Sequence, residues 1–365
     1  MAVVVWATVR RGGHLGMDNA FAVRAARALL DGGAPYADKR FLYLPGAVLA
    51  AVPEALLPGG WLVWLVPAAG VGLVLLGWWL SLRIFGVAAG SRLAVLVVVA
   101  LPFFQPFRNL VTLGNWTLAS VVALPLALLL ARRTRWAAAG AVLGLALAIK
   151  PMLVPVLLLF VFARRWRALA AAIAVPLLVS ALAALAMPRP GMFFTRTLPF
   201  LLRGQDAFAR PYDASLGAVL ARLGMPGTVA YGVAVAAATA GVACAYLRWR
   251  RGDDGPLRLV ETAAMLLLAA FLVSRPSFDH YLLVALGPLL ASIALPGSVP
   301  RTVWFWIGLV PQVSGLDWPH LEDIRRRAFK DAAMLWTLAA VLGWACLRRR
   351  PAAGGEDRTP VRGAF

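Results

Sequence analysis

The sequence has few of the side chains that bind metals or crosslink a chain. Among 365 residues there are 2 cysteines and 3 histidines. Cys244 and Cys346 both lie inside apolar segments, so we interpret them as small core residues and exclude a disulfide framework. His14, His280 and His320 fit neither an HxxxH nor a CxxC spacing. We therefore expect no zinc site and no cofactor.

Charge is also scarce: 14% of the residues are charged, whereas 61% are hydrophobic. This balance excludes an ordinary soluble domain and indicates a membrane protein. The formal net charge is +20, which in a soluble protein would suggest nucleic acid. Here the basic residues form short runs between apolar segments, so we interpret them as orientation signals and contacts to the lipid bilayer. We expect no nucleic-acid partner.

Apolar segments long enough, or nearly long enough, to cross a bilayer recur along the chain. We predict an all-α, polytopic helix bundle with about 11–12 transmembrane helices, forming one domain over residues 1–347. A basic tail, residues 348–365, is expected to be disordered and cytoplasmic. The first apolar residues are too short to span, which indicates either a shortened first helix or a start that omits part of it. The predicted spans are 61–80, 92–107, 111–131, 136–149, 152–163, 168–187, 227–247, 259–273, 281–295, 302–314 and 332–347.

The charge pattern predicts which way the chain crosses the membrane. If Asp18 lies outside and the spans alternate, the dense basic runs face the cytoplasm, in agreement with the positive-inside rule. Examples are RRTR at 132–135 and RRWR at 164–167. Eleven of the 16 acids then lie outside, together with Lys150 and His280. We expect a multi-pass protein of a bacterial plasma membrane whose active site faces the extracytoplasmic side.

Two long segments fall on that side. Residues 18–60 are expected to hold a juxtamembrane helix, and FFTRTLPFLLRGQDAF within 188–226 has the apolar face and basic edge of a helix lying in the interface. Re-entrant segments are also expected there, because proline and glycine interrupt the apolar runs. Such segments favour a site at the membrane surface.

Asp18 is the first acid of the chain and precedes an amphipathic helix pattern, with Phe21, Ala25 and Leu29 on one face and Arg24 on the other. It therefore lies at or next to the helix N-cap. Two roles are compatible with this position: Asp18 caps the helix, or it acts as a general base.

Lys150 ends an uncharged run and is followed by Pro151, which is tolerated in the first turn of a helix. A lysine beside a helix N-terminus suits a phosphate, and we favour this interpretation over a snorkelling anchor. The loop SRPSFDHY (274–281) places Asp279 and His280 on the same side, which makes His280 a candidate phosphate or hydroxyl donor.

Two further polar features are less specific. Asn115 in GNW lies at the outer end of a span, where its amide either contacts a sugar hydroxyl or joins two helices. The run Arg325–Arg327 is balanced by acids and is expected to form a solvated helix face.

These motifs, in this order, resemble glycosyltransferase family 87, multi-spanning enzymes of the GT-C type that use polyprenyl-phosphate sugars. MDNAFAVRAARALLDGGAPY followed by FLYLPGAVLAAVPEALLP resembles the family's opening, and NLVTLGNWTL followed by GLALAIKPMLVPVLLLF resembles its central region. MFFTRTLPFLLRG is closest to the actinobacterial α-(1→3)-arabinofuranosyltransferases of cell-wall biogenesis. After about Gly297 only the hydropathy matches.

The resemblance implies an inverting transferase with a polyprenyl-phosphate sugar donor, an arabinofuranose or else a mannose, and a glycan or glycolipid acceptor. It implies Asp18 as the catalytic base, and Lys150, His280 and Arg196 at the donor phosphate. Further substrate contacts are expected from Asn19, Tyr43, Asn115 and Asp279.

A lipid transporter or flippase is the alternative from another class, because broken helices and intramembrane charge suit it too. The one-sided acids, the long outside segments and the lack of an obvious inverted repeat count against it.

Overall fold

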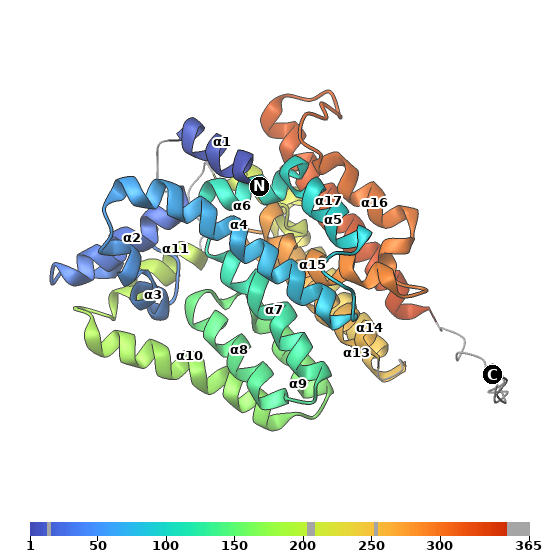
Figure 1. Cartoon of the computed structure of the whole chain (residues 1–365), viewed down its shortest axis with the longest axis horizontal. Coiled ribbons are helices and arrows are strands. Elements are labelled where there is room, and N and C mark those ends of the chain that lie inside the picture. Colours follow the sequence, from blue (N-terminus) through green and yellow to red (C-terminus); the bar gives the residue numbers. More distant parts are fainter. Residues whose placement is uncertain (13–15, 203–208, 252–254, 349–365) are drawn as a thin grey trace, which may run out of the picture.

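The computed structural model describes residues 1–12, 16–202, 209–251 and 255–348, which form a bundle of helices (Figure 1). Over these ranges no residue lies in a β-strand, and Phe104 and Val313 form an isolated bridge. The predicted all-α fold is confirmed. The predicted tail lies outside the described residues from 349 onward, as do residues 203–208 of the second long segment and His14.

Five helices of the described chain are long and apolar enough to cross a membrane. They are α4 (Gly59–Ile84), α10 (Trp166–Ala186), α13 (Gly227–Arg251), α14 (Pro256–Val273) and α17 (Asp323–Leu347). A sixth span results if α6 (Gln105–Leu113) and α7 (Thr117–Arg132), which meet at an angle of 119°, are counted together. Each long helix matches one predicted span.

The other predicted spans are also helical, but they are shorter than a bilayer-crossing helix. We expected about 11–12 spans, and the described chain has five or six. Proline breaks the apolar runs into α-helical and 3₁₀ pieces, because its ring clashes with the preceding turn. The shorter pieces are α5 (Arg92–Ala100) with η2 (Leu101–Phe103), α8 (Trp136–Ile149), η3 (Pro151–Val156) with α9 (Leu157–Phe162), η6 (Asp279–Leu282) with α15 (Leu283–Ala291) and η7 (Ser292–Ala294), and η8 (Val299–Arg301) followed by α16 (Val303–Leu309) with η9 (Val310–Gln312).

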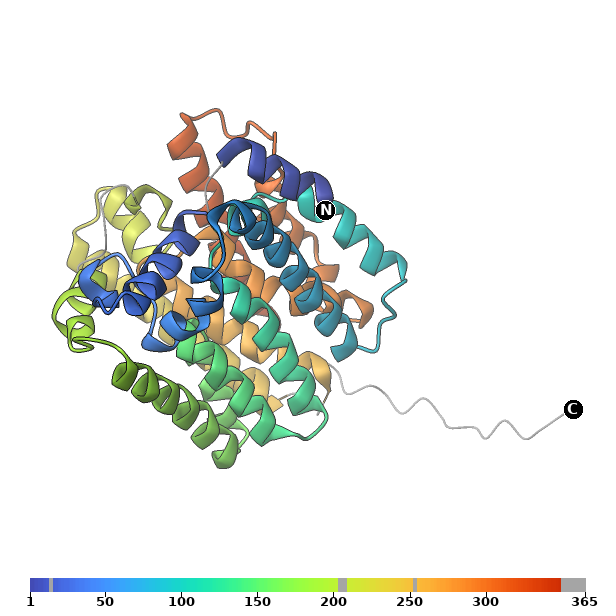
Figure 2. The same cartoon turned by 60° about the vertical axis from the view of Figure 1, so that its left-hand side comes forward.

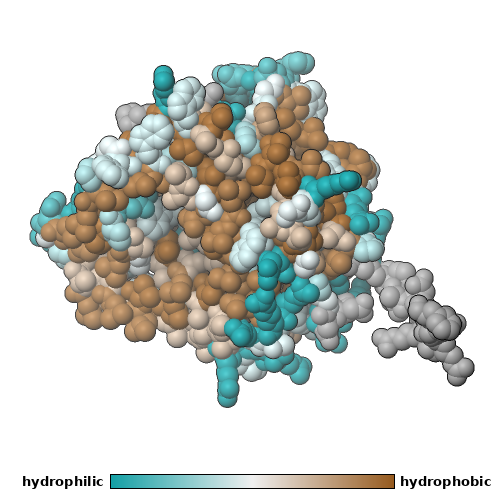
Figure 3. All heavy atoms as spheres, viewed as in Figure 1, coloured by the Kyte–Doolittle hydropathy of each residue, from teal (hydrophilic) through white to brown (hydrophobic). Residues whose placement is uncertain are grey.

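Helix α14 forms the centre of the bundle. Fourteen of its residues are buried, compared with three in α10 and five in α13. Figure 3 shows broad brown, apolar areas on the visible face, including the lower left where α10 lies. A hydrophobic exterior around a packed interior is the arrangement that a bilayer requires. Glu261 on α14 is buried against Arg248 of α13, at 2.6 Å.

The two predicted outside segments pack together beside the bundle. They contain α2 (Met17–Leu30), η1 (Pro35–Ala37), α3 (Pro45–Ala55), the π-helical η4 (Phe193–Thr197) and α11 (Leu198–Leu202). Figures 1 and 2 both show α2 and α3 next to the green chain that includes α11. Tyr36 of the first segment contacts Phe193 of the second edge-on and also packs against Phe41 of its own segment. The second segment continues through η5 (Arg210–Tyr212) and α12 (Leu216–Arg222).

The buried face of α2 includes the predicted one and is wider. Ala25 is buried and Phe21 and Leu29 pack half-buried against the same cluster, as predicted, and Ala22, Val23 and Ala26 are fully buried as well. Small alanines let α2 pack closely on α3, and this contact places the larger side chains at its edge.

The bundle has two distinct ends. Helix α7 begins at Thr117, which accepts a hydrogen bond from Lys150, and ends near Arg132, which donates to the carbonyl of Ile84. Helix α7 is 16 residues long, about 24 Å, and these contacts lie at its two ends. We call them the Lys150 end and the Arg132 end.

Candidate functional site

Two glycines bring the start of α2 against the bend between α6 and α7. Gly114 ends α6 in the left-handed conformation, with φ of 58°. Gly16 precedes α2 with φ of 75°, and a Cβ there would lie 2.6 Å from the carbonyl oxygen of Leu113. Only glycine permits this close approach at a positive φ. The side chain of Asp18 therefore lies beside that of Asn115.

Asn115 joins three elements at the Lys150 end. Its Nδ2 donates to Asp18 Oδ2 at 2.6 Å, and its Oδ1 accepts from Lys150 Nζ at 3.0 Å and from the backbone N–H of Thr117 at 2.8 Å. The side chain is buried. Both predicted roles of Asn115 were possible from the sequence, and its observed contacts are those of a linker between elements.

Asp18 is the second residue of α2, and the N-cap is Gly16. The prediction that Asp18 lies at or next to the N-cap is therefore corrected by one residue. The carboxylate lies in the first turn, where the helix dipole stabilises a negative charge. It is half-buried, with Asn115 as its hydrogen-bond donor.

Lys150 immediately precedes the helix η3, with extended backbone, and Pro151 is the first residue of that helix as predicted. Its ammonium donates to Asn115 and to Thr117 Oγ1 at 2.8 Å. It also lies 4.0 Å from the ring centre of Tyr281. Burial lowers the pKa of Lys150 to about 7, although the charge of Asp18 acts in the opposite direction.

Asn19 and Tyr43 lie next to this group. Asn19 is buried, donates to Glu54 at 2.7 Å and accepts from the indole of Trp116 at 2.8 Å. Burial raises the pKa of Glu54, and the hydrogen bond from Asn19 reduces this effect. The ring of Tyr43 lies between Trp116 and Lys150, with centroid distances of 6.1 and 5.9 Å.

His280 contacts its two sequence neighbours, Asp279 and Tyr281. Its Nδ1 lies 3.2 Å from Asp279 Oδ1, and the two side chains are almost fully buried. The His280 ring contacts Tyr281 edge-on, with centroids 4.9 Å apart. Tyr281 thus connects His280 to Lys150. The Nε2 atom of His280 is buried and makes no hydrogen bond to the described residues.

Asp279 is surrounded by protein groups. Its Oδ2 accepts from Asn109 of α6, and Arg327 lies 3.9 Å from Oδ1. Burial would raise the pKa of Asp279, but His280, Arg327 and Asn109 outweigh that effect and lower it. These contacts are those of a residue that orients His280 through Nδ1.

Arg327 and Asp331 are two site residues that the sequence did not reveal. Arg327 was expected on a solvated face, but its guanidinium points inward, 3.8 Å from Asp331 and 4.5 Å above the ring of Tyr212. Asp331 is buried and accepts from Gln312 at 2.9 Å. The i, i+4 spacing of Arg327 and Asp331 was the available signal.

A small cavity lies beside the 274–281 loop. It has a volume of about 220 Å³ and contains three exposed arginines, Arg210, Arg222 and Arg275, beside the buried Asp213. Asp213 accepts from the backbone N–H groups of Ser215 and Ser277, both at 2.9 Å. The Asp213 carboxylate therefore fixes the 274–281 loop against the second long segment.

Arg196 contacts the first long segment. It is exposed on η4 and donates to the carbonyl of Ala37 at 3.3 Å. This contact joins the two long segments to each other and does not link Arg196 to Lys150. Among the described residues, no three His, Cys, Asp or Glu side chains are grouped so as to hold a metal ion.

Comparison with known proteins identifies relatives of the chain. The sequence pattern of glycosyltransferase family 87 matches residues 41–274. An α-(1→3)-arabinofuranosyltransferase of Mycobacterium tuberculosis is 31% identical over 280 residues, 75% of this chain and 63% of that protein. The protein of the same name from Mycolicibacterium smegmatis is 29% identical over 279 residues, 75% of this chain and 64% of that protein.

The corresponding protein of Corynebacterium glutamicum is 29% identical over 195 residues, which cover 52% of this chain and 45% of that protein. The chain thus spans less than two thirds of the length of these relatives. No solved structure matches it. The family match begins after Asp18 and ends before His280.

Proposed function

The chain belongs to glycosyltransferase family 87, and from this premise we propose that it transfers arabinofuranose from a polyprenyl-phosphate donor to a glycan or glycolipid acceptor. The relatives' names support the sugar and the α-(1→3) linkage. The observation that carries the proposal is the arrangement of Asp18 and Lys150 on either side of Asn115. A base and a cation fixed on one amide suit a displacement at a sugar carbon.

In this mechanism Asp18 takes the proton of the acceptor hydroxyl while the hydroxyl oxygen attacks the anomeric carbon. The bond between that carbon and the phosphate oxygen breaks, and polyprenyl phosphate leaves with the electron pair. Attack from the opposite face inverts the configuration, so a β-linked donor gives an α-linkage. Asp18 is half-buried, and within the described part of the chain Asn115 donates to its Oδ2, so that Oδ1 can accept the proton of the substrate.

Lys150 has the complementary role at the leaving group. Its ammonium stabilises the charge that develops on the departing phosphate, and Asn115 and Thr117 hold it in place beforehand. The position of Lys150 directly before η3 supports this assignment, because a helix N-terminus favours an anion. We assign a further hydrogen-bond donor at the phosphate to His280, oriented by Asp279, and Arg196 is a second candidate.

In this proposal the protein is a multi-pass enzyme of the bacterial plasma membrane, and its Lys150 end faces the extracytoplasmic side. The basic runs of the Arg132 end support this orientation. It needs no cofactor in this mechanism, because cationic side chains carry the charge of the leaving group.

The test uses purified protein in detergent with synthetic decaprenyl-phospho-β-arabinofuranose, decaprenyl-phospho-mannose and an oligoarabinoside acceptor. We expect transfer from the arabinose donor and an α-(1→3) linkage in the product by NMR. Transfer from the mannose donor alone would instead identify a mannosyltransferase of the family. Movement of labelled donor across vesicles without transfer would identify a flippase.

A further inference from the structure

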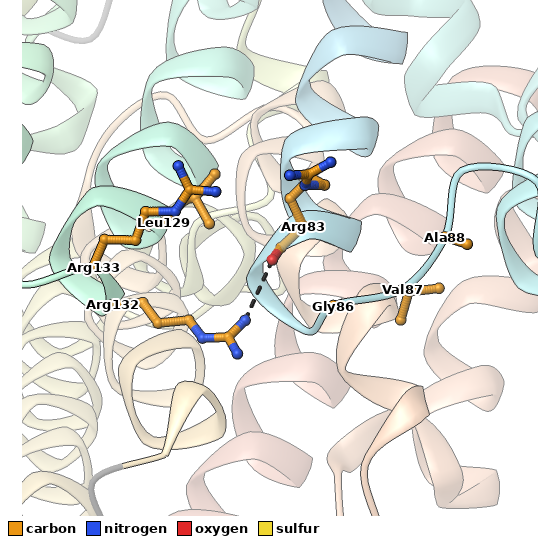
Figure 4. A pocket seen from close by; sticks show the side chains of 7 residues that line it. All are labelled: Arg83, Gly86, Val87, Ala88, Leu129, Arg132 and Arg133. Atoms are coloured by element: carbon orange, nitrogen blue, oxygen red, sulfur yellow. Dashed lines mark hydrogen bonds between the residues drawn. The ribbon is translucent and has the colours of Figure 1, made fainter.

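The Arg132 end holds a second cavity that the proposed reaction does not use. Its volume is about 500 Å³, and it lies where the last turns of α4 and α7 meet the loop that follows α4 (Figure 4). Three arginines surround it. The lining residues are Arg83, Gly86, Val87, Ala88, Leu129, Arg132 and Arg133.

The charge in this cavity is not compensated. None of its lining residues is acidic, and in the described part of the chain no carboxylate forms an ion pair with Arg83, Arg132 or Arg133. Three guanidinium groups close together repel one another unless an anion lies between them. Guanidinium also matches the geometry of phosphate oxygens.

One arginine has a structural role, which accounts for only part of the cluster. Arg132 donates to the carbonyls of Ile84 and Arg83 and so satisfies the end of α4, as the dashed line in Figure 4 shows for Arg83. Figure 4 shows the Arg83 and Arg133 side chains across the gap from each other. The Arg83 guanidinium lies 5.5 Å from the ring centre of Trp79. Arg132 is therefore fixed in place, and Arg83 and Arg133 remain available to a ligand.

The surface next to the cavity is apolar. Leu76 and Trp79 lie seven and four residues before Arg83, so all three share one face of α4. Both apolar side chains are 41% exposed. An apolar stripe thus runs from the cavity along a membrane-crossing helix. A lipid acyl chain can pack on this stripe, whereas a free inorganic anion would make no use of it.

We propose that this cavity binds the phosphate headgroup of an anionic phospholipid, with an acyl chain along Leu76 and Trp79. Basic pockets between transmembrane helices on the cytoplasmic side bind such headgroups, and the Arg132 end lies on that side in the orientation proposed above. The phosphate offsets part of the positive charge of the three arginines and joins the ends of α4 and α7. This site is independent of the transfer reaction and about one helix length from Lys150.

The experiment is native mass spectrometry of the full chain in detergent, titrated with dioleoylphosphatidylglycerol or dioleoylphosphatidylcholine. The variant is Arg83→Gln/Arg133→Gln, which leaves Arg132 to cap α4. The matched control, Arg164→Gln/Arg167→Gln, removes two exposed arginines from the same end outside the cavity. We expect the cavity variant to bind phosphatidylglycerol about 30-fold more weakly, at roughly fivefold per arginine, and phosphatidylcholine as the wild type does.

The control should retain the wild-type affinity, and thermal unfolding without added lipid should be similar for all three proteins. Equal binding of phosphatidylglycerol by the cavity variant and the wild type would overturn the proposal. An equal loss in the control would also overturn it, since the effect would then be one of total charge. Competition by millimolar inorganic phosphate would show that the site takes free anions rather than a lipid.

Discussion

Asp18 and Lys150 are connected through the single amide of Asn115, which donates to the carboxylate at 2.6 Å and accepts from the ammonium at 3.0 Å. The residues come from sequence positions more than 130 apart, and the bend after α6 brings them together. The amide separates the opposite charges, so they do not form a direct ion pair that would satisfy both. Each retains capacity for a substrate.

Replacing Lys150 tests the cation. Lys150→Ala should lower kcat/KM for the lipid donor by about 10²–10³-fold, as loss of one preorganised donor to a developing negative charge does. Lys150→Arg should recover part of the lost kcat/KM. Lys39→Ala is the matched control, because Lys39 is exposed on the first long segment. An unchanged rate for Lys150→Ala at all donor concentrations would make Lys150 a structural anchor.

The low pKa of Lys150 predicts a pH dependence. An ammonium with a pKa of about 7 loses its charge as the pH rises through that value, so kcat/KM should fall above about pH 7. In Lys150→Arg this alkaline fall should disappear, since arginine stays protonated. The measurement is the initial rate at low donor concentration from pH 6 to 9. An alkaline fall that persists in Lys150→Arg would assign it to another group.

The sequence predicted much of the fold but less of the site. Apolar runs identified all five long helices, because burial in lipid acts on each run separately, but they did not identify the short α12 or η5. Their lengths were less accurate, because proline divides runs at the level of single turns. The approach of Asp18, Asn115 and Lys150 depends on the bend at Gly114 and the contact at Gly16, which join distant parts of the chain. Their distances and hydrogen bonds follow from that packing.

The inward position of Arg327 was missed for a related reason. A run of arginines flanked by acids predicts a solvated face, and only the packing of α17 against η6 shows which arginine points inward. Two buried carboxylates, Asp279 and Asp331, flank it, and neither was recognisable as buried from local sequence.

The acids around Arg327 lead to a stability prediction. Arg327→Gln removes the cation between Asp279 and Asp331 and should lower the free energy of unfolding by about 1–3 kcal/mol, less than a fully buried ion pair because Arg327 is partly exposed. Asp331→Asn instead removes one of two like charges and should be neutral or stabilising. Arg325→Gln, at an exposed position, is the control. Thermal unfolding in detergent measures all three, and equal losses in both Arg327→Gln and Asp331→Asn would contradict the assignment.

Topology is tested with single cysteines in a Cys244→Ala/Cys346→Ala background. Lys39→Cys lies on the Lys150 side and Arg167→Cys at the Arg132 end, and both positions are exposed. With an impermeant maleimide on intact cells, position 39 should react and position 167 should react only after permeabilisation. Reaction at 167 alone would invert the orientation and place the site in the cytoplasm.

Asp18 provides the most direct test of the chemistry. Asp18→Asn keeps the shape of the side chain and an oxygen that accepts from Asn115, but the amide cannot take a proton. Transfer should fall by about 10²–10⁴-fold. Because Asp18 is not the N-cap, the stability cost should be limited to its interaction with the helix dipole, about 0.3–1 kcal/mol.

A purely structural Asp18 predicts a different order of effects. Asp18→Asn would then be nearly as active as the wild type, whereas Asp18→Ala, which loses the acceptor for Asn115, would be less stable and less active. Asp31→Asn, an exposed acid at the other end of α2, controls for the loss of one charge and should have normal activity. Turnover and thermal unfolding of the three variants separate the two cases. A folded Asp18→Asn protein with wild-type turnover would rule out Asp18 as the base, whereas loss of turnover in Asp18→Asn with retained stability requires the carboxylate itself.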